Sequence, residues 1–249
     1  MVDILRLENI SNSFDGLKVI DNLNMNVKAG KISAIIGPNG AGKTTLFNLI
    51  CGYLYPDNGS IIYKDKDISM LPPWERASIG IGRLFQDIRV FKKLTLLENL
   101  LVTFNDSSDS PLKAMFGRRD KKEKEKIESS LKWLDFVGLI DIKENLAENL
   151  SWGQQKLLSL ARLLCGNFDL LLIDEPVSGV SPSMADSILG KIKELRSLNK
   201  TIIIVEHDMD AVKEISDYVY FMDSGKFAAS GSPQEIFGNQ KVIGSYLGV

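Results

Sequence analysis

The stretch Gly37-Pro38-Asn39-Gly40-Ala41-Gly42-Lys43-Thr44-Thr45 matches the pattern G-x-x-x-x-G-K-[ST] at every fixed position. Before it, the apolar and β-branched segment Ile32–Ile36 is typical of a buried strand, and after it residues 46–50 have helical spacing. Between a strand and a helix, glycines let the backbone wrap around an anion and point N–H groups at it, and the helix dipole adds attraction. The sequence therefore predicts a P-loop that binds a nucleoside triphosphate.

Two side chains of this loop carry the chemistry of phosphate binding. Lys43 supplies a cation for the β- and γ-phosphates, and the Thr44 hydroxyl is placed to bind Mg²⁺. The alternative is a glycine turn that precedes a helix by chance, and the matching strand and helix on either side argue against it. We expect the nucleotide to contact these residues of the loop: Gly37, Asn39, Gly40, Ala41, Gly42, Lys43, Thr44 and Thr45.

The composition is that of an ordinary globular protein. Of 249 residues, 44% are apolar and 25% are charged, and the formal charge of -2 gives no long-range attraction for nucleic acid. No apolar run approaches the ~18–20 residues of a membrane-spanning helix, and residues 1–6 lack the features of a signal peptide. Cys51 and Cys165 lie in apolar helical contexts, so we expect buried thiols in a reducing compartment. These features predict a soluble, cytoplasmic protein.

The pattern along the chain predicts an α/β core that is interrupted by a helical lobe. Alternating apolar residues predict early strands over 5–10 and 19–27, and continuous apolar runs predict buried strands over 170–173 and 201–206. A strand over 80–85 ends at Gln86, and a capping box of the form T-x-x-E then opens a helix at Thr95. We therefore expect one domain over 1–249. Its core spans 1–86 and 166–249, and its helical lobe spans 87–165.

Polar residues follow both of the buried strands in the second half of the chain. The first strand ends at Asp174 and Glu175, and adjacent carboxylates are costly there unless a cation or a proton-transfer role compensates them. An exposed turn is the alternative, but a P-loop needs a carboxylate linked to Mg²⁺. His207 is the sole histidine of the chain and follows the second strand. A lone histidine is usually structural, yet this position is where α/β sheets bind ligands.

Two further positions suggest contacts with a nucleotide. Phe14 lies in the turn between the two early strands, where it could be a core aromatic or could stack on a base. Ser151 is a natural N-cap for a helix that reaches Cys165, and Gly153 leaves backbone N–H groups uncovered, so this helix start could also hold phosphate. The second pattern is weak when it is taken alone.

Taken together, these motifs resemble those of the nucleotide-binding subunits of ATP-binding-cassette (ABC) transporters, and the resemblance covers the whole chain. Residues 37–45 look like the family's P-loop, and residues 150–154 look like its LSGGQ signature. Asp174 is similar to the Walker B aspartate, and Glu175 is similar to the catalytic glutamate. In the same way, Gln86 matches the Q-loop glutamine and His207 matches the switch histidine of the family. Phe14 matches the base-stacking aromatic, and the resemblance implies Val19 as a further nucleotide contact.

The resemblance implies both a fold and an activity. The fold is α/β: a P-loop NTPase (RecA-like) core with an antiparallel β subdomain at the N-terminus and an inserted helical lobe. The activity is ATP hydrolysis coupled to transmembrane transport. Glu175, His207 and Gln86 would be catalytic. Mg²⁺ would be bound by Thr44, Gln86 and Asp174.

The resemblance also implies partners. Two ABC ATPases would pair head to tail as a homodimer or heterodimer, so that Ser151, Gly153 and Gln154 of one protomer close over the γ-phosphate held by the other. Integral-membrane permease subunits would hold the pair on the inner face of the cell membrane, with a substrate-binding protein as an indirect partner and no role for nucleic acid. The sequence departs from the family pattern at Trp152 in the signature and at Ser181 in the D-loop.

Finer details are similar to the ATPases of branched-chain amino-acid importers. They are the segment 82–91, the segment 205–209 and the ending Tyr246-Leu247-Gly248. The alternatives are a urea or short-amide importer and a lipopolysaccharide exporter, which shares this ending. ABC ATPases that work in DNA repair or translation, and a nonhydrolytic regulatory module, are further alternatives. The single cassette, the ordinary insertion and the presence of Glu175 and His207 argue against these last classes.

Overall fold

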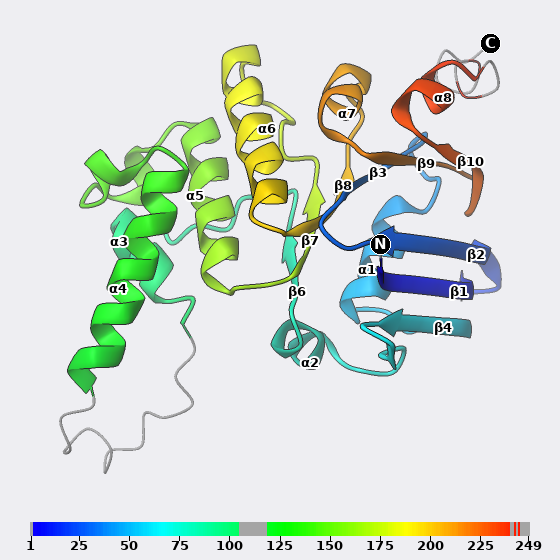
Figure 1. The fold of residues 1–249 in the computed structure, drawn as a ribbon, viewed down its shortest axis with the longest axis horizontal. Coiled ribbons are helices and arrows are strands. Elements are labelled where there is room, and N and C mark those ends of the chain that lie inside the picture. Colours follow the sequence, from blue (N-terminus) through cyan, green and yellow to red (C-terminus); the bar gives the residue numbers. More distant parts are fainter. Residues whose placement is uncertain (1, 105–118, 240–241, 243, 245–249) are drawn as a thin grey trace. The chain divides into compact units, whose positions relative to one another are not determined.

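The computed structural model describes residues 2–104, 119–239, 242 and 244 (Figure 1). The chain divides into two compact units. The first comprises Met1–Arg83, Phe168–Pro176 and Ile192–Val249, and the second comprises Leu84–Asn167 and Val177–Lys191. The division derived from the sequence remains a prediction. Residues 177–191, which it assigned to the core, group with the second unit.

A six-stranded sheet forms the centre of the first unit. Its strand order is β10-β9-β3-β8-β7-β6, and β3 (Ile32–Ile36) lies parallel to β8 (Thr201–Val205), which in turn lies parallel to β7 (Leu170–Asp174). All residues of β3, β7 and β8 are buried, as their continuous apolar sequences predict. The remaining strands are β9 (Tyr218–Asp223), β10 (Lys226–Gly231) and β6 (Ile81–Leu84). The predicted α/β core is therefore confirmed.

An antiparallel sheet is built from the N-terminal part of the same unit. Its order is β2-β1-β4-β5, with β1 (Asp3–Phe14) between β2 (Leu17–Lys28) and β4 (Asn58–Tyr63). The short β5 (Lys66–Asp67) closes one edge. Alternating burial along β2 follows the alternating sequence, since one face of the sheet packs on the core. The predicted N-terminal β subdomain is confirmed.

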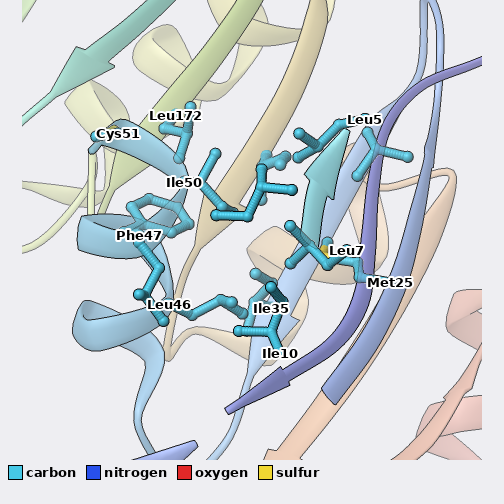
Figure 2. Close-up of a cluster of buried hydrophobic side chains, with 14 of the residues drawn as sticks. Leu5, Leu7, Ile10, Met25, Ile35, Leu46, Phe47, Ile50, Cys51 and Leu172 are labelled. Carbon is cyan, nitrogen blue, oxygen red and sulfur yellow. The ribbon is translucent and has the colours of Figure 1, made fainter. Parts of the chain in front are cut away.

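Helix α1 (Lys43–Cys51) joins these sheets through one apolar cluster. Figure 2 shows Leu46, Phe47 and Ile50 of α1 in the same cluster as Leu7 of β1 and Leu172 of β7. These side chains are fully or almost fully buried, and each contributes about 1.5–3 kcal/mol to stability by leaving water. The other helices of this unit are α2 (Pro73–Ser78), α7 (Met209–Ile215) and α8 (Pro233–Phe237).

The carboxyl end of α1 is held by a fully buried arginine that the sequence analysis did not single out. The Arg76 guanidinium donates hydrogen bonds to the carbonyl oxygens of Leu49 and Ile50 in α1, at 2.5 and 2.9 Å. It also donates to the carbonyls of Ser69 and Leu71. The last carbonyls of a helix lack partners within the helix, so this cation satisfies them and stabilises the helix that follows the P-loop.

The second unit is helical. It contains α3 (Leu96–Leu101), α4 (Arg119–Phe136), α5 (Trp152–Cys165) and residues 182–191 of α6 (Pro182–Ser197). Short 3₁₀ turns occupy Ile140–Ile142 and Ala147–Asn149. The predicted capping box at Thr95 is confirmed, because the Thr95 and Glu98 side chains bond each other's backbone N–H groups. Among the helices of residues 2–104 and 119–239, none has the length and apolar composition of a membrane span.

Three smaller expectations have mixed outcomes. Cys51 and Cys165 are free and buried as predicted, and burial raises the pKa of each thiol to about 11. The strand predicted to end at Gln86 ends instead at Leu84, because the chain leaves the sheet there and Gln86 lies in a bend. The ending Tyr246-Leu247-Gly248 lies outside the described residues.

Candidate functional site

The P-loop lies between β3 and α1 and is pressed against neighbouring backbone. At Gly37 a Cβ atom would lie 2.0 Å from the carbonyl oxygen of Met222 in β9, so a side chain is excluded by packing. Gly42 has a φ of 105°, and a Cβ there would lie 3.1 Å from the carbonyl oxygen of Val19. Glycine is therefore required at both ends of the loop, for space at the first position and for backbone conformation at the second.

The amino end of α1 is open to an anion. Its N-cap is Gly42, which has no side chain to bond the first N–H groups, and the first turn contains no acidic residue. Thr44 is exposed in this turn and Thr45 is half-buried. Asn39 and Gly40 are exposed at the tip of the loop, and Ala41 is buried. Uncovered N–H groups and a positive helix end together favour phosphate at this position.

Lys43 is buried inside the loop. Its ammonium nitrogen, Nζ, donates to the carbonyl oxygens of Gly37 and Pro38, at 2.6 and 2.9 Å. Burial lowers the pKa of Lys43, while the negative charges of Glu175 and Asp174 oppose this shift. The ammonium therefore lies within the electrostatic field of both carboxylates, and phosphate oxygens could replace the loop carbonyls as its partners.

The structure brings the carboxylates and the histidine to one edge of the sheet. Asp174 ends β7 opposite Val205 of β8, and the Glu175 N–H donates to the Val205 carbonyl at 2.9 Å. His207 follows β8, and its Nε2 lies 2.7 Å from Oε1 of Glu175. Parallel strands that pair in register place their carboxyl ends together, as Figure 1 shows for β7 and β8.

Glu175 also has an unusual backbone conformation. Its φ of 46° lies in the left-handed region, which a residue with a side chain rarely adopts. Such conformations cost about 1–3 kcal/mol and cluster at functional sites, where the surrounding structure maintains them. Here the hydrogen bond from the Glu175 N–H to Val205 and the contact with His207 hold the residue in place.

The Asp174 carboxylate is buried beside a cation. Burial raises the pKa of Asp174, and the charge of Arg83 opposes this shift. The Arg83 guanidinium forms an ion pair with the carboxylate, with 3.1 Å between Nη2 and Oδ2. Arg83 was not predicted as a site residue. Its position three residues before Gln86 gave no signal in the sequence, because its partners are far away along the chain.

The oxygen donors at this edge suit Mg²⁺ that arrives with a nucleotide. Among the described residues, no group of three or more His, Cys, Asp and Glu side chains could hold a metal ion by itself. Mg²⁺ commonly takes one or two protein oxygens and completes its octahedron with phosphate and water. The buried carboxylate of Asp174 and the exposed hydroxyl of Thr44 fit that pattern.

Two predicted nucleotide contacts lie on the first hairpin. Phe14 is the last residue of β1 and is 44% exposed, so the interpretation of a core aromatic is excluded. Val19 is half-buried, and its backbone lies against Gly42 of the P-loop. Their contact with a nucleotide remains a prediction.

The other predicted site residues belong to the second unit. Gln86 is exposed in the bend after β6, and its role in binding Mg²⁺ and water remains a prediction. Ser151 caps α5 as predicted. Its Oγ accepts from the Gln154 N–H at 3.3 Å, and Oε1 of Gln154 accepts from the Ser151 N–H at 2.9 Å. The S-x-x-Q spacing of this capping box was present in the sequence and was missed.

The two departures from the family pattern lie at the starts of α5 and α6. The Trp152 side chain is 51% exposed, and its Nε1 lies 3.5 Å from where a Gly179 Cβ would be. A Cβ at Gly153 would lie 2.4 Å from Cγ of Met184 in α6. The carbonyl of Ser181 accepts from the Met184 N–H at 3.0 Å. The signature stretch (residues 150–154) and the D-loop (residues 178–181) thus pack on each other within this unit.

Comparisons with known proteins find relatives of this chain in sequence and in fold. The family model described as "ABC transporter" matches residues 20–178. The chain is 39% identical to a probable branched-chain amino acid transport ATP-binding protein, LivG, of Archaeoglobus fulgidus, over 98% of this chain and 95% of that protein. It is 36% identical to the high-affinity branched-chain amino acid transport ATP-binding protein LivG of Escherichia coli, over 98% of each chain. A solved structure of the ADP conformation of an ATP-binding cassette of an ABC transporter has a TM-score of 0.89, 36% identity and full coverage of both chains.

Proposed function

The chain belongs to the ABC transporter family as an ATP-hydrolysing, nucleotide-binding subunit, and from this premise we propose that it powers the import of branched-chain amino acids. The substrate class is supported by the names of the full-length relatives and by the sequence segments 82–91 and 205–209. These relatives favour branched-chain amino acids over the alternatives of urea, short amides or lipopolysaccharide.

The observation that carries the hydrolytic mechanism is the pair of Glu175 and His207 beside the P-loop lysine. Lys43 and the amino end of α1 would bind the phosphates of ATP. Mg²⁺, held by Thr44 and Asp174, would neutralise charge on the β- and γ-phosphate oxygens. Glu175 would orient or deprotonate the attacking water, and His207 would hold the Glu175 carboxylate and contact the γ-phosphate.

The partners follow from what one protomer lacks. We expect a homodimer or heterodimer in which Ser151, Gly153 and Gln154 of one protomer close over the γ-phosphate bound by the other. The capping box between Ser151 and Gln154 holds this helix start in one conformation, which suits a surface that must meet phosphate. Permease subunits would carry the pair at the inner face of the membrane and receive the motion of closure and reopening.

The substrate assignment can be tested by reconstitution. We expect proteoliposomes that contain this chain, its permease subunits and their substrate-binding protein to accumulate leucine, isoleucine or valine. ATP is supplied on the side of the cassette, and radiolabelled substrate is supplied on the other side. A Lys43→Ala protein, which loses the ammonium that binds phosphate, serves as the inactive control. Uptake of urea in preference to leucine would overturn the assignment.

The segment after Gln86 is a candidate for contact with a permease. The Phe91 ring is 50% exposed, and the Arg162 guanidinium lies 5.0 Å from its centroid. The Arg162 side chain also donates to the Arg89 carbonyl. The buried Asn99 side chain anchors the segment after Gln86. Its Oδ1 accepts from the Phe91 N–H at 2.8 Å, and its Nδ2 donates to the Leu94 carbonyl at 3.3 Å. An exposed ring beside the Arg162 guanidinium, on a well-anchored segment, suits an amphipathic helix of a partner.

We expect the double variant Phe91→Ala, Arg89→Ala to separate binding from coupling. ATP binding by the isolated protein should stay within a few-fold of normal, while assembly with the permeases or uptake should fail. Val102→Ala is the matched control, because Val102 is also 50% exposed in the same unit and should tolerate the change. Normal assembly and uptake by the double variant would place the coupling surface elsewhere.

A further inference from the structure

Arg83 connects the helix of the P-loop with the carboxylate at the end of β7. Its Nη1 donates to Oδ1 of Asn48 in α1 at 2.6 Å, and its Nη2 donates to Oδ2 of Asp174 at 3.1 Å. The guanidinium also lies 5.5 Å from the centroid of the Phe47 ring, and the Arg83 side chain is 7% exposed. One planar cation therefore spans two elements that both contribute to the nucleotide site.

A guanidinium suits this position better than an ammonium. Its N–H groups lie in one plane and point in fixed directions, so two nitrogens can bond two different acceptors at the same time. With one nitrogen on Asn48 and the other on Asp174, the orientation of the carboxylate is set relative to α1. The ion pair is made by Oδ2, one of the two oxygens with which Asp174 would hold a metal.

We propose that Arg83 is a positioning residue for Mg²⁺, because it holds the Asp174 carboxylate in the orientation in which the metal binds. The proposal rests on the proposed role of Asp174 as a ligand of Mg²⁺. Partners that orient a metal ligand without touching the metal typically change metal affinity by about 10–100-fold when they are lost. Arg83 would act on metal binding through the orientation of this carboxylate.

A second buried arginine allows this role to be distinguished from simple stabilisation. Arg76 lies in the same unit, is fully buried and also anchors α1, but its guanidinium donates to backbone carbonyls of α1 and of the preceding loop instead of to Asp174. Arg76→Lys should therefore lower the unfolding temperature without changing how nucleotide binding depends on Mg²⁺. Arg83→Lys keeps the charge beside Asp174 but removes the planar fork.

The experiment measures the affinity for a fluorescent ATP analogue as Mg²⁺ is titrated, with EDTA as the zero point. In Arg83→Lys we expect the half-saturating Mg²⁺ concentration to rise about tenfold, while the affinity in EDTA stays within about twofold. Asn48→Ala, which removes the other anchor and leaves the ion pair in place, should shift it in the same direction by less. This variant carries the test if Arg83→Lys does not fold, as judged by circular dichroism.

Three results would overturn the proposal. Equal shifts in Arg83→Lys and Arg76→Lys would show that loss of stability explains the effect. A half-saturating Mg²⁺ concentration that is unchanged or lower in both Arg83→Lys and Asn48→Ala would show that Arg83 does not orient the carboxylate. Asp174→Asn is the test of the premise: if it binds Mg²⁺ and nucleotide normally, Asp174 is not a ligand and the proposed metal site fails as well.

Discussion

Replacement of Glu175 by glutamine is expected to slow ATP hydrolysis by ~10²-fold or more, which is the usual range for loss of a general base. Glutamine has nearly the same size and its side-chain oxygen can still accept a hydrogen bond from Nε2 of His207, which lies 2.7 Å from Glu175 in the native protein. The left-handed backbone at this position is therefore expected to persist. What glutamine cannot do is accept a proton from water.

ATP binding should survive this change because the phosphates are expected to be held by the P-loop. Lys43→Ala provides the contrast, since it removes the buried ammonium and should weaken binding as well as turnover. ATPase assays and nucleotide titrations on both variants distinguish them, because both should lose turnover but only Lys43→Ala should lose nucleotide affinity.

A carboxylate next to the site serves as the matched control. The Asp208 side chain caps α7 by accepting from the N–H groups of Asp210 and Ala211, at 2.9 and 3.1 Å. Asparagine is an equally good N-cap, so Asp208→Asn should hydrolyse ATP at a near-normal rate. Near-normal turnover in Glu175→Gln, or an equal loss in Asp208→Asn, would contradict the assignment of Glu175.

The second large effect is expected at Gly153. If the start of α5 closes over the γ-phosphate of a partner protomer, a carboxylate at this position would face a phosphate and repel it. We expect Gly153→Asp to raise the dissociation constant of the ATP-bound dimer by about 100-fold or more, which corresponds to roughly 2.7 kcal/mol. The affinity of a monomer for ATP should change little, since its own P-loop is intact.

The structure determines how this experiment must be designed. A Cβ at Gly153 would lie 2.4 Å from Cγ of Met184, so any side chain there disturbs packing within the same chain. Met184→Ala should make room for it. The informative comparison is therefore between two double variants. One combines Gly153→Asp with Met184→Ala, and the other combines Gly153→Ala with Met184→Ala. Both have a new Cβ at position 153, but only the first has a new charge.

Sedimentation velocity with ATP, in proteins that also carry Glu175→Gln to prevent hydrolysis, measures the outcome. The protein with Gly153→Ala and Met184→Ala should form dimers. The protein with Gly153→Asp and Met184→Ala should remain monomeric. Dimers of equal stability in both proteins would show that the signature stretch has a structural role only. Loss of dimers in both would show that packing against Met184, rather than charge, controls the surface.

Local sequence determined many of the secondary-structure elements and motifs of this protein. The P-loop was predictable because its glycines, its lysine and the strand and helix around it are contiguous. The buried strands β7 and β8 were predictable from short apolar runs, and the cap at Thr95 from a glutamate three positions later. Such features depend on backbone propensity and on hydrogen bonds between near neighbours, which a sequence displays directly.

Contacts between distant residues were decided only by the tertiary structure. The bridge from Asn48 through Arg83 to Asp174, the burial of Arg76 under α1 and the crowding of Gly37 by the Met222 carbonyl have no periodic signal in the sequence. The end of β6 at Leu84 rather than Gln86 belongs to the same class. Each depends on which elements the topology places side by side. Packing selects these contacts from many that the same residues could make, so local sequence alone does not specify them.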